Sequence, residues 1–133
     1  ASRKTAELEN VQVLRSETSF VVRHLLPPNS VEAFYLLFPD PWPKRRHHRR
    51  RLVTEDFLAS IWTALTENGS VIIATDHAEY FTCIRQLATK SKGLIPFDDE
   101  AAHKFPMSTF EKRFRDAGIP VQRLELRKTS PVI

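Results

Sequence analysis

Two short apolar runs predict buried strands in the middle of the chain. Residues 33–38 (Ala-Phe-Tyr-Leu-Leu-Phe) and residues 70–75 (Ser-Val-Ile-Ile-Ala-Thr) are each bounded by turn-forming sequence. Runs of this length favour strands that are buried on both faces, as in a parallel sheet. Between them Thr54 can cap a helix that carries Glu55 and Asp56 in its first turn. The predicted inner face of this helix, which should end at Asn68-Gly69, is Phe57, Leu58, Ile61, Ala64 and Leu65.

A second helix is predicted directly after the second run. Asp76 stands where it can cap this helix, and the predicted inner face is Tyr80, Phe81, Ile84, Leu87 and Ala88. Further along, Ser108-Thr109-Phe110-Glu111 has the spacing of a capping box and predicts a short helix through Asp116. Residues 121–126 alternate between two faces, which predicts a partly exposed antiparallel strand at the end of the sheet.

The other segments carry weaker signals. Residues 1–9 resemble the tail of a helix, and Val11, Val13 and Leu14 predict a short strand. Residues 17–24 predict one or two helical turns before a Leu-Leu-Pro-Pro break. Residues 94–97 predict a strand, and residues 98–106 an irregular polar loop.

This alternation of strands and helices predicts an open α/β sheet, and we expect residues 1–133 to form a single domain. Sites in such sheets gather beyond the C-terminal ends of the parallel strands. The turn at residues 38–42 and the turn at Thr75-Asp76 both follow predicted strands. We therefore expect these two turns to face the same cleft.

Positive charge is concentrated in one segment. The chain has 20 Lys and Arg against 16 Asp and Glu, a net charge of +4. Six of the 20 lie in residues 44–51, and without them the balance is 14 against 16, or −2. This distribution favours a localised anionic partner. A solvated charge run or a nuclear-import-like tract is the alternative interpretation.

Glycine and cysteine usage narrows the chemistry further. Gly69, Gly93 and Gly118 are far apart, so the sequence has neither a G-x-G-x-x-G loop nor a P-loop. Cys83 is the only cysteine, so no disulfide can form within the chain, and a reducing cytosol suits it. No apolar run is long enough for a transmembrane helix, and we expect no membrane association. We predict no metal site.

Three motifs give the sequence a specific resemblance. Residues 38–52, which begin Phe-Pro-Asp-Pro-Trp-Pro-Lys-Arg-Arg-His, resemble the signature of the tRNA (guanine-N7)-methyltransferases. Ala74-Thr75-Asp76 resembles the second carboxylate turn of that family, and residues 108–113 resemble its Thr-x-Phe-Glu motif. The resemblance runs in order along essentially the whole chain. It implies a Rossmann-like class I methyltransferase sheet, mostly parallel with an antiparallel last strand, and a cytoplasmic enzyme.

The resemblance also implies a substrate and a set of acids. The family transfers a methyl group from S-adenosylmethionine to N7 of a guanosine in the tRNA variable loop. Guanine N7 has an exposed lone pair at neutral pH, so the site must align N7 and tolerate the positive charge of the product. Asp40 is the predicted catalytic residue, and Asp76 and Glu111 are predicted to bind the guanine edge. Alternatively, Asp40 closes an Asx turn, and the two other acids only cap helices.

The same motifs implicate further substrate-binding residues. Lys44, Arg46, His47 and Arg50 match positions at which the family grips RNA phosphates. Ser108 stands where the family usually has Thr, which keeps the hydroxyl and loses a methyl group. Trp42 is expected either to stack on a base or to pack beneath the loop.

The donor side is the part of the family pattern that this sequence lacks. By resemblance the chain is the C-terminal two-thirds of a methyltransferase domain, without the first two strands and their glycine-rich segment. Glu17 is the one predicted cofactor residue, near the adenine. We therefore expect this chain by itself to bind S-adenosylmethionine weakly or not at all and to be inactive.

Without those strands the sheet would have bare edges. Either the strand at residues 11–14 pairs directly with the strand at residues 33–38, or another chain covers the gap, or the chain is part of a longer protein. Self-association through these edges follows from the second alternative.

Two other functions stay open from sequence. The chain could be a non-catalytic RNA-binding remnant, or a basic α/β domain that binds nucleic acid without chemistry. Equal affinity for tRNA and random duplex DNA would favour the latter.

Overall fold

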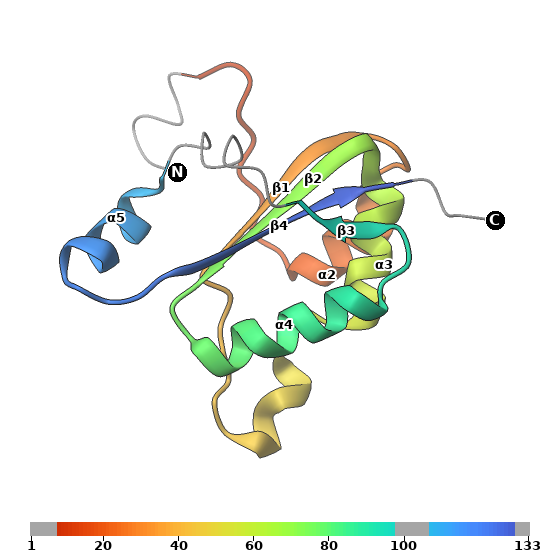
Figure 1. Cartoon of the computed structure of the whole chain (residues 1–133). Helices are drawn as coiled ribbons and strands as arrows, with labels where there is room; N and C mark the ends of the chain where they lie inside the picture. Colours follow the sequence, from red (N-terminus) through yellow and green to blue (C-terminus); the bar gives the residue numbers. More distant parts are fainter. Residues whose placement is uncertain (1–7, 98–106, 130–133) are drawn as a thin grey trace.

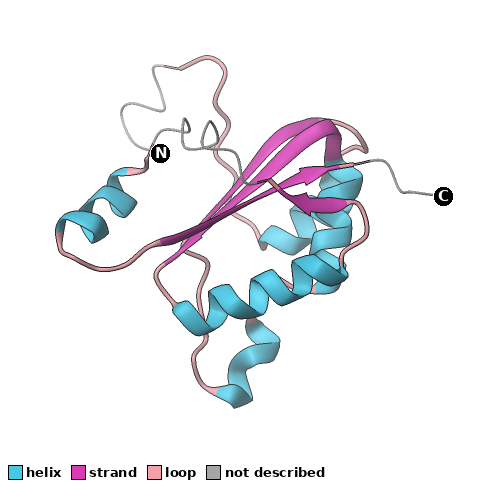
Figure 2. Cartoon of the chain, in the orientation of Figure 1, coloured by secondary structure: helices cyan, strands magenta, loops and turns pink. Residues whose placement is uncertain are grey.

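A four-stranded sheet lies at the centre of the protein, in a computed structural model that describes residues 8–97 and 107–129. Its order is β1-β2-β4-β3, made of β1 (Val31–Leu37), β2 (Leu65–Thr75), β4 (Gln122–Lys128) and β3 (Leu94–Pro96). β1 and β2 are parallel, and β4 is antiparallel to both of its neighbours, so three strands run one way and the last runs the other (Figure 2). The predicted α/β sheet with an antiparallel last strand is confirmed.

Helices occupy one face of this sheet and the end beyond it. The short α2 (Thr18–Phe20) continues into a π-helix, η1 (Val21–Leu25), and lies with α3 (Glu55–Ala64) and α4 (Ala78–Lys90) on the same face (Figure 1). α5 (Thr109–Asp116) lies beyond the ends of the strands. The basic segment (residues 44–51) contains a 3-10 helix, η2 (Arg45–Arg50). The helices predicted at residues 17–24 and 108–116 are confirmed.

The core fills the space between β2 and the helices. It includes Val71 and Ile73 from β2, Leu58 from α3, and Ile84 from α4. β2 is buried on both faces from Gly69 to Thr75, as its apolar run predicts. The helix faces predicted from periodicity are also confirmed, because their side chains are buried or pack against this core.

β1 differs from the prediction of burial on both faces. Leu36 is buried against the helices, but Tyr35 and Leu37, which point the other way, are exposed. The cause is position in the sheet, since β1 is the outer strand and pairs only with β2 among the described residues. The predicted strand at residues 11–14 is wrong: this segment is exposed and without regular structure, and it does not pair with β1.

The boundary between α3 and β2 also differs from the prediction. α3 ends at Ala64, and Leu65 already belongs to the strand, where it pairs with Val31. The buried Lys128 ammonium donates to the Leu65 carbonyl oxygen (2.7 Å), which holds this backbone extended. Gly69 therefore lies inside the strand, where a Cβ would come within 2.8 Å of the Thr66 carbonyl oxygen.

Residues 8 and 9, predicted to end a helix, are not helical. Residues 1–7 and the loop predicted at 98–106 lie outside the described residues. The predicted strand at residues 94–97 is confirmed by β3. No described helix combines the length and apolarity that crossing a bilayer requires.

Candidate functional site

The two carboxylates predicted from the motifs follow paired strand ends. Leu37 pairs with Ala74 in the parallel register, and the Phe38 N–H donates to the Ala74 carbonyl oxygen (2.8 Å). Asp40 and Asp76 each come two residues after this hydrogen bond. Both are exposed, and neither forms a hydrogen bond or ion pair with the described part of the chain. The two turns therefore leave the sheet at the same edge, and the expectation that they face a common cleft stays a prediction.

The backbone of the Asp40 turn is unusual. Phe38 has φ +52° and Trp42 has φ +40°, values that bulky side chains rarely adopt. Such conformations persist where surrounding contacts enforce them, and they cluster at functional sites. Here the Phe38 ring packs edge-on against Phe110 and Phe114 of α5, with centroids 4.9 and 5.2 Å away. The turn that carries Asp40 is thereby tied to α5.

Asp76 does not cap α4, contrary to the sequence prediction. The cap is His77, whose Nδ1 accepts a hydrogen bond from the Tyr80 N–H (3.1 Å). The Thr75 hydroxyl accepts from the His77 N–H (3.1 Å), which fixes the start of the helix one residue later than predicted. Asp40, for its part, makes no Asx-turn hydrogen bond. The purely structural alternatives for these two carboxylates therefore find no support in the described contacts.

Ser108 and Glu111 form half of the predicted capping box. The Ser108 hydroxyl accepts from the Glu111 N–H (3.1 Å), but the Glu111 carboxylate does not reach back to residue 108. It is completely buried, with Oε1 3.0 Å from Arg115 Nη2 and 3.4 Å from Arg123 Nε, the latter an ion pair without hydrogen-bond alignment. Glu111 Oε2 accepts no hydrogen bond.

Arg123 connects this acid to the same sheet edge, because it pairs across the sheet with Ala74. Sequence reasoning missed Arg123. Its only signal was a charged side chain in an alternating strand.

The basic segment presents several cations to solvent. Lys44, Arg46 and Arg50 are exposed and form no ion pair with a described residue. His47 is half-buried and lies edge-on to Trp42, with centroids 5.8 Å apart, while the Arg50 guanidinium lies 5.1 Å from the Trp42 ring. Trp42 thus packs against two side chains of the segment, and its two predicted roles stay open.

Arg51, the last cation of the run, behaves differently from the others. It is 6% exposed, and its Nε donates to the Pro41 carbonyl oxygen (2.8 Å). Its two terminal nitrogens donate to the carboxylate of Glu79 in α4. This pairing raises the pKa of the Arg51 guanidinium and lowers the pKa of the Glu79 carboxyl group. Sequence reasoning counted Arg51 only as charge. The apolar pair that follows it, Leu52-Val53, was the available sign that the chain turns inward there.

Glu17, the predicted cofactor residue, caps α2. Its carboxylate accepts from the backbone N–H groups of Ser19 (3.1 Å) and Phe20 (2.8 Å), and hydrogen bonds led by the Ser19 hydroxyl lower its pKa. It lines a cleft of about 260 Å³ with Thr54 and Asp56, a cleft that includes neither Asp40 nor Asp76. Glu17 is therefore occupied as a helix cap and lines a cleft separate from the two exposed aspartates.

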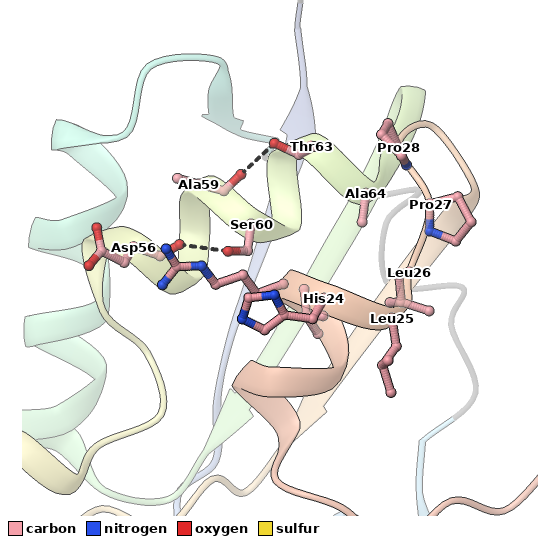
Figure 3. A pocket seen from close by; sticks show the side chains of 12 residues that line it. His24, Leu25, Leu26, Pro27, Pro28, Asp56, Ala59, Ser60, Thr63 and Ala64 are labelled. Carbon is pink, nitrogen blue, oxygen red and sulfur yellow. Dashed lines mark hydrogen bonds between the residues drawn. The ribbon is translucent and has the colours of Figure 1, made fainter.

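A larger cleft lies away from the predicted site. It measures about 660 Å³ between η1 with the residues that follow it and the outer face of α3 (Figure 3). None of the predicted site residues lines it. Within residues 8–97 and 107–129, no three His, Cys, Asp or Glu side chains are grouped so that they could hold a metal ion.

Comparison with known proteins decides the family. A family model described as "Putative methyltransferase" matches residues 1–124. The chain belongs to this methyltransferase family. Among curated proteins it is 35% identical over 120 residues to the tRNA (guanine-N(7)-)-methyltransferase of Rhodococcus jostii, covering 89% of this chain and 46% of that protein.

Another relative gives a similar picture. A tRNA (guanine-N(7)-)-methyltransferase of Leptospira interrogans is 35% identical over 114 residues, covering 84% of this chain and 52% of that protein. The chain thus spans about half the length of these relatives. A solved structure from Thermus thermophilus, described as a "putative DNA modification methylase", is 12% identical, covering 87% of this chain and 51% of that one, with a TM-score of 0.47.

Proposed function

We propose that this protein methylates N7 of a guanosine in the variable loop of tRNA, in the cytoplasm, with S-adenosylmethionine as the methyl donor. The observation that carries the proposal is the pair of exposed carboxylates, Asp40 and Asp76, two residues beyond the joined ends of β1 and β2. A segment of exposed cations follows Asp40 directly. Relatives named for this activity support the choice of substrate.

The carboxylates suit guanine because of its hydrogen-bonding edge. Guanine N1–H and the N2 amino group are donors, and ionised carboxylates are acceptors only. The exposed Asp76 would accept from this edge. The Oε2 of Glu111 lacks a partner but is completely buried, so Glu111, with Ser108 at its N–H, would reach the base only after a movement that exposes it. Asp40 would act as the catalytic residue by stabilising the positive charge that the base acquires.

No general base is required, because N7 already exposes its lone pair. When bound, the donor supplies an electrophilic methyl group. This chain's own residues would orient the base and neutralise its charge. Lys44, Arg46, His47 and Arg50 would hold the RNA backbone and fix its register without specifying sequence.

Substitution of Asp40 tests the catalytic assignment. In a preparation of the protein that methylates tRNA, Asp40→Ala should abolish formation of 7-methylguanosine, measured by mass spectrometry of nuclease digests. Affinity for tRNA should stay within about twofold, because phosphate contacts dominate affinity. Full activity in Asp40→Ala would reject the assignment.

Substitution of the basic segment tests the RNA grip. Arg46→Gln together with Arg50→Gln should weaken tRNA binding and reduce the slope of log affinity against log salt by roughly 0.7–0.9 per lost phosphate contact. Lys90→Gln with Lys92→Gln, which removes two exposed cations at the far end of α4, is the matched control. Equal losses in both double variants would indicate a general charge effect.

An RNA-binding protein without methyltransferase activity is the second candidate. The observation behind it is that the carboxylate of Glu17, the predicted cofactor residue, is occupied as the cap of α2. Specific tRNA binding without any 7-methylguanosine formation would support this candidate.

A further inference from the structure

We propose that Arg51, held by Glu79, is a positioning residue that keeps the basic segment (residues 44–51) in register with Asp40 and Asp76. The proposal rests on the proposed function, because it assigns Arg51 a role in the binding of tRNA. It separates Arg51 from the exposed cations of the same run, which would contact phosphates directly.

The contacts of Arg51 reach two parts of the chain, the turn that carries Asp40 and the start of α4. Nε donates to the Pro41 carbonyl oxygen (2.8 Å), Nη1 donates to Glu79 Oε1 (3.3 Å), and Nη2 donates to Glu79 Oε2. The guanidinium also lies over the Tyr80 ring, 4.6 Å from its centroid. A guanidinium has five N–H donors in a fixed plane, so this set of contacts fixes its orientation as well as its position.

The two anchor points adjoin the two carboxylate turns. Pro41 is the residue after Asp40, so the hydrogen bond from Arg51 fixes the Pro41–Trp42 peptide, one residue beyond Asp40. Glu79 lies in the first turn of α4, three residues after Asp76. One side chain therefore links the backbone next to Asp40 to the helix that follows Asp76.

A second contact secures the exit of the basic segment. The Val53 N–H donates to the Tyr80 hydroxyl (3.1 Å), and both groups are buried. Tyr80 thus holds the chain on one side of Arg51, and Glu79 holds the guanidinium on the other. Because η2 lies between Pro41 and this exit, both of its ends are attached to the start of α4.

Burial determines what Arg51 can do. At 6% exposure, with three of its five N–H groups donating to Pro41 and Glu79, it is not available for a phosphate. Its effect on tRNA binding must come from the placement of its neighbours. Glu79, by contrast, has a side chain that is 56% exposed and negatively charged beside the RNA-binding surface.

The two possible roles of Glu79 predict opposite changes in tRNA affinity when its charge is removed. If Glu79 acted only through its charge, Glu79→Gln would strengthen tRNA binding by removing a repulsive group. If it holds Arg51, the same substitution should weaken binding by roughly three- to tenfold, within the range for residues coupled in one network. Glu67→Gln is the matched control, because Glu67 is an exposed acid in β2 whose side chain has no described partner.

Arg51→Lys adds a variant in which the net charge does not change. Lysine keeps the cation but cannot hold Pro41 and both Glu79 oxygens at once, so tRNA binding should weaken as in Glu79→Gln. Binding that is as tight in Glu79→Gln as in Glu67→Gln, or unaffected in Arg51→Lys, would overturn the inference.

A measurement without RNA separates this inference from the proposed function. In a Trp62→Phe background, Trp42 is the only tryptophan, and its emission reports the packing of the basic segment. Glu79→Gln and Arg51→Lys should shift this emission to longer wavelength, whereas Arg46→Gln should not. Unchanged emission in both would overturn the inference. If the unsubstituted chain binds no tRNA, the proposed function fails, and the emission still decides whether Arg51 holds the segment.

Discussion

The backbone N–H of Phe38 donates a hydrogen bond to the carbonyl oxygen of Ala74 (2.8 Å), and this contact joins the ends of β1 and β2. After this hydrogen bond both segments turn away from the sheet, and each carries an aspartate two residues later. A slip of one residue in the parallel register would move one carboxylate without the other. The pairing of the strands thus sets the spacing of Asp40 and Asp76.

At the start of α4, His77 should contribute to stability and Asp76 to guanosine recognition. His77→Ala removes the cap and should lower the free energy of unfolding by about 1 kcal/mol. Asp76→Asn should leave that free energy unchanged, because Asp76 bonds to no described residue, and should weaken guanosine recognition. Urea unfolding together with a tRNA methylation assay checks both, and a destabilised Asp76→Asn would contradict this division.

The hydroxyl of Ser108 should matter for α5 independently of its predicted role with substrate. Ser108→Ala should cost about 1 kcal/mol of stability by leaving the Glu111 N–H without its cap. Ser108→Thr, which restores the residue usual in the family, should retain most of that stability. Thermal unfolding measures both variants, and equal melting temperatures for Ser108→Ala and the unsubstituted chain would argue against the cap.

The stabilising contribution of the Arg51–Glu79 ion pair should be lost at low pH. Arg51 lowers the pKa of Glu79 below its usual 4.5, so the unfolded chain takes up the proton first as the pH falls. The contribution of the pair to stability is therefore present above pH 4.5 and is lost as the pH falls through the lowered pKa. Trp42 emission in the Trp62→Phe background should show a transition below pH 4.5 that Glu79→Gln lacks. A transition of the same size in Glu79→Gln would assign it to another group.

This chain, measured alone, should bind S-adenosylmethionine weakly or not at all. Its three glycines form no donor loop, and the Glu17 carboxylate is already used by the Ser19 and Phe20 N–H groups. Titration calorimetry should give no saturable heat at micromolar concentrations of donor. Micromolar affinity would show that residues other than Glu17 form a donor site.

The outer edge of β1 should promote self-association. β1 pairs only with β2 among the described residues, and unpaired strand edges are templates for another strand. Light scattering should show a mass that rises with concentration, and Leu37→Lys should reduce this effect by placing a charge on the edge strand. Ile95→Lys, on an exposed position of β3 at the opposite edge, is the control. A constant monomer mass would reject the prediction.

The sequence by itself determined the parts of the fold that depend on local pattern. The run at residues 70–75 identified the buried central strand, and the periodicity after Thr54 identified the inner face of α3. The capping signals of Thr54 and Ser108 were also sufficient, because these contacts span only three residues. The same local signals led to error at Asp76, where one residue of helix offset moved the cap to His77.

Only the tertiary structure decided how distant segments combine. Exposed Tyr35 and Leu37 on β1 follow from its place at the edge of the sheet, which an apolar run does not encode. Arg51 and Arg123 looked like ordinary cations until Glu79 and Glu111 came within reach, 28 and 12 residues away in the sequence. Burial of a charge depends on partners that the fold brings from elsewhere. For this reason the sequence could identify the exposed carboxylates but not the buried arginine that links the turns next to them.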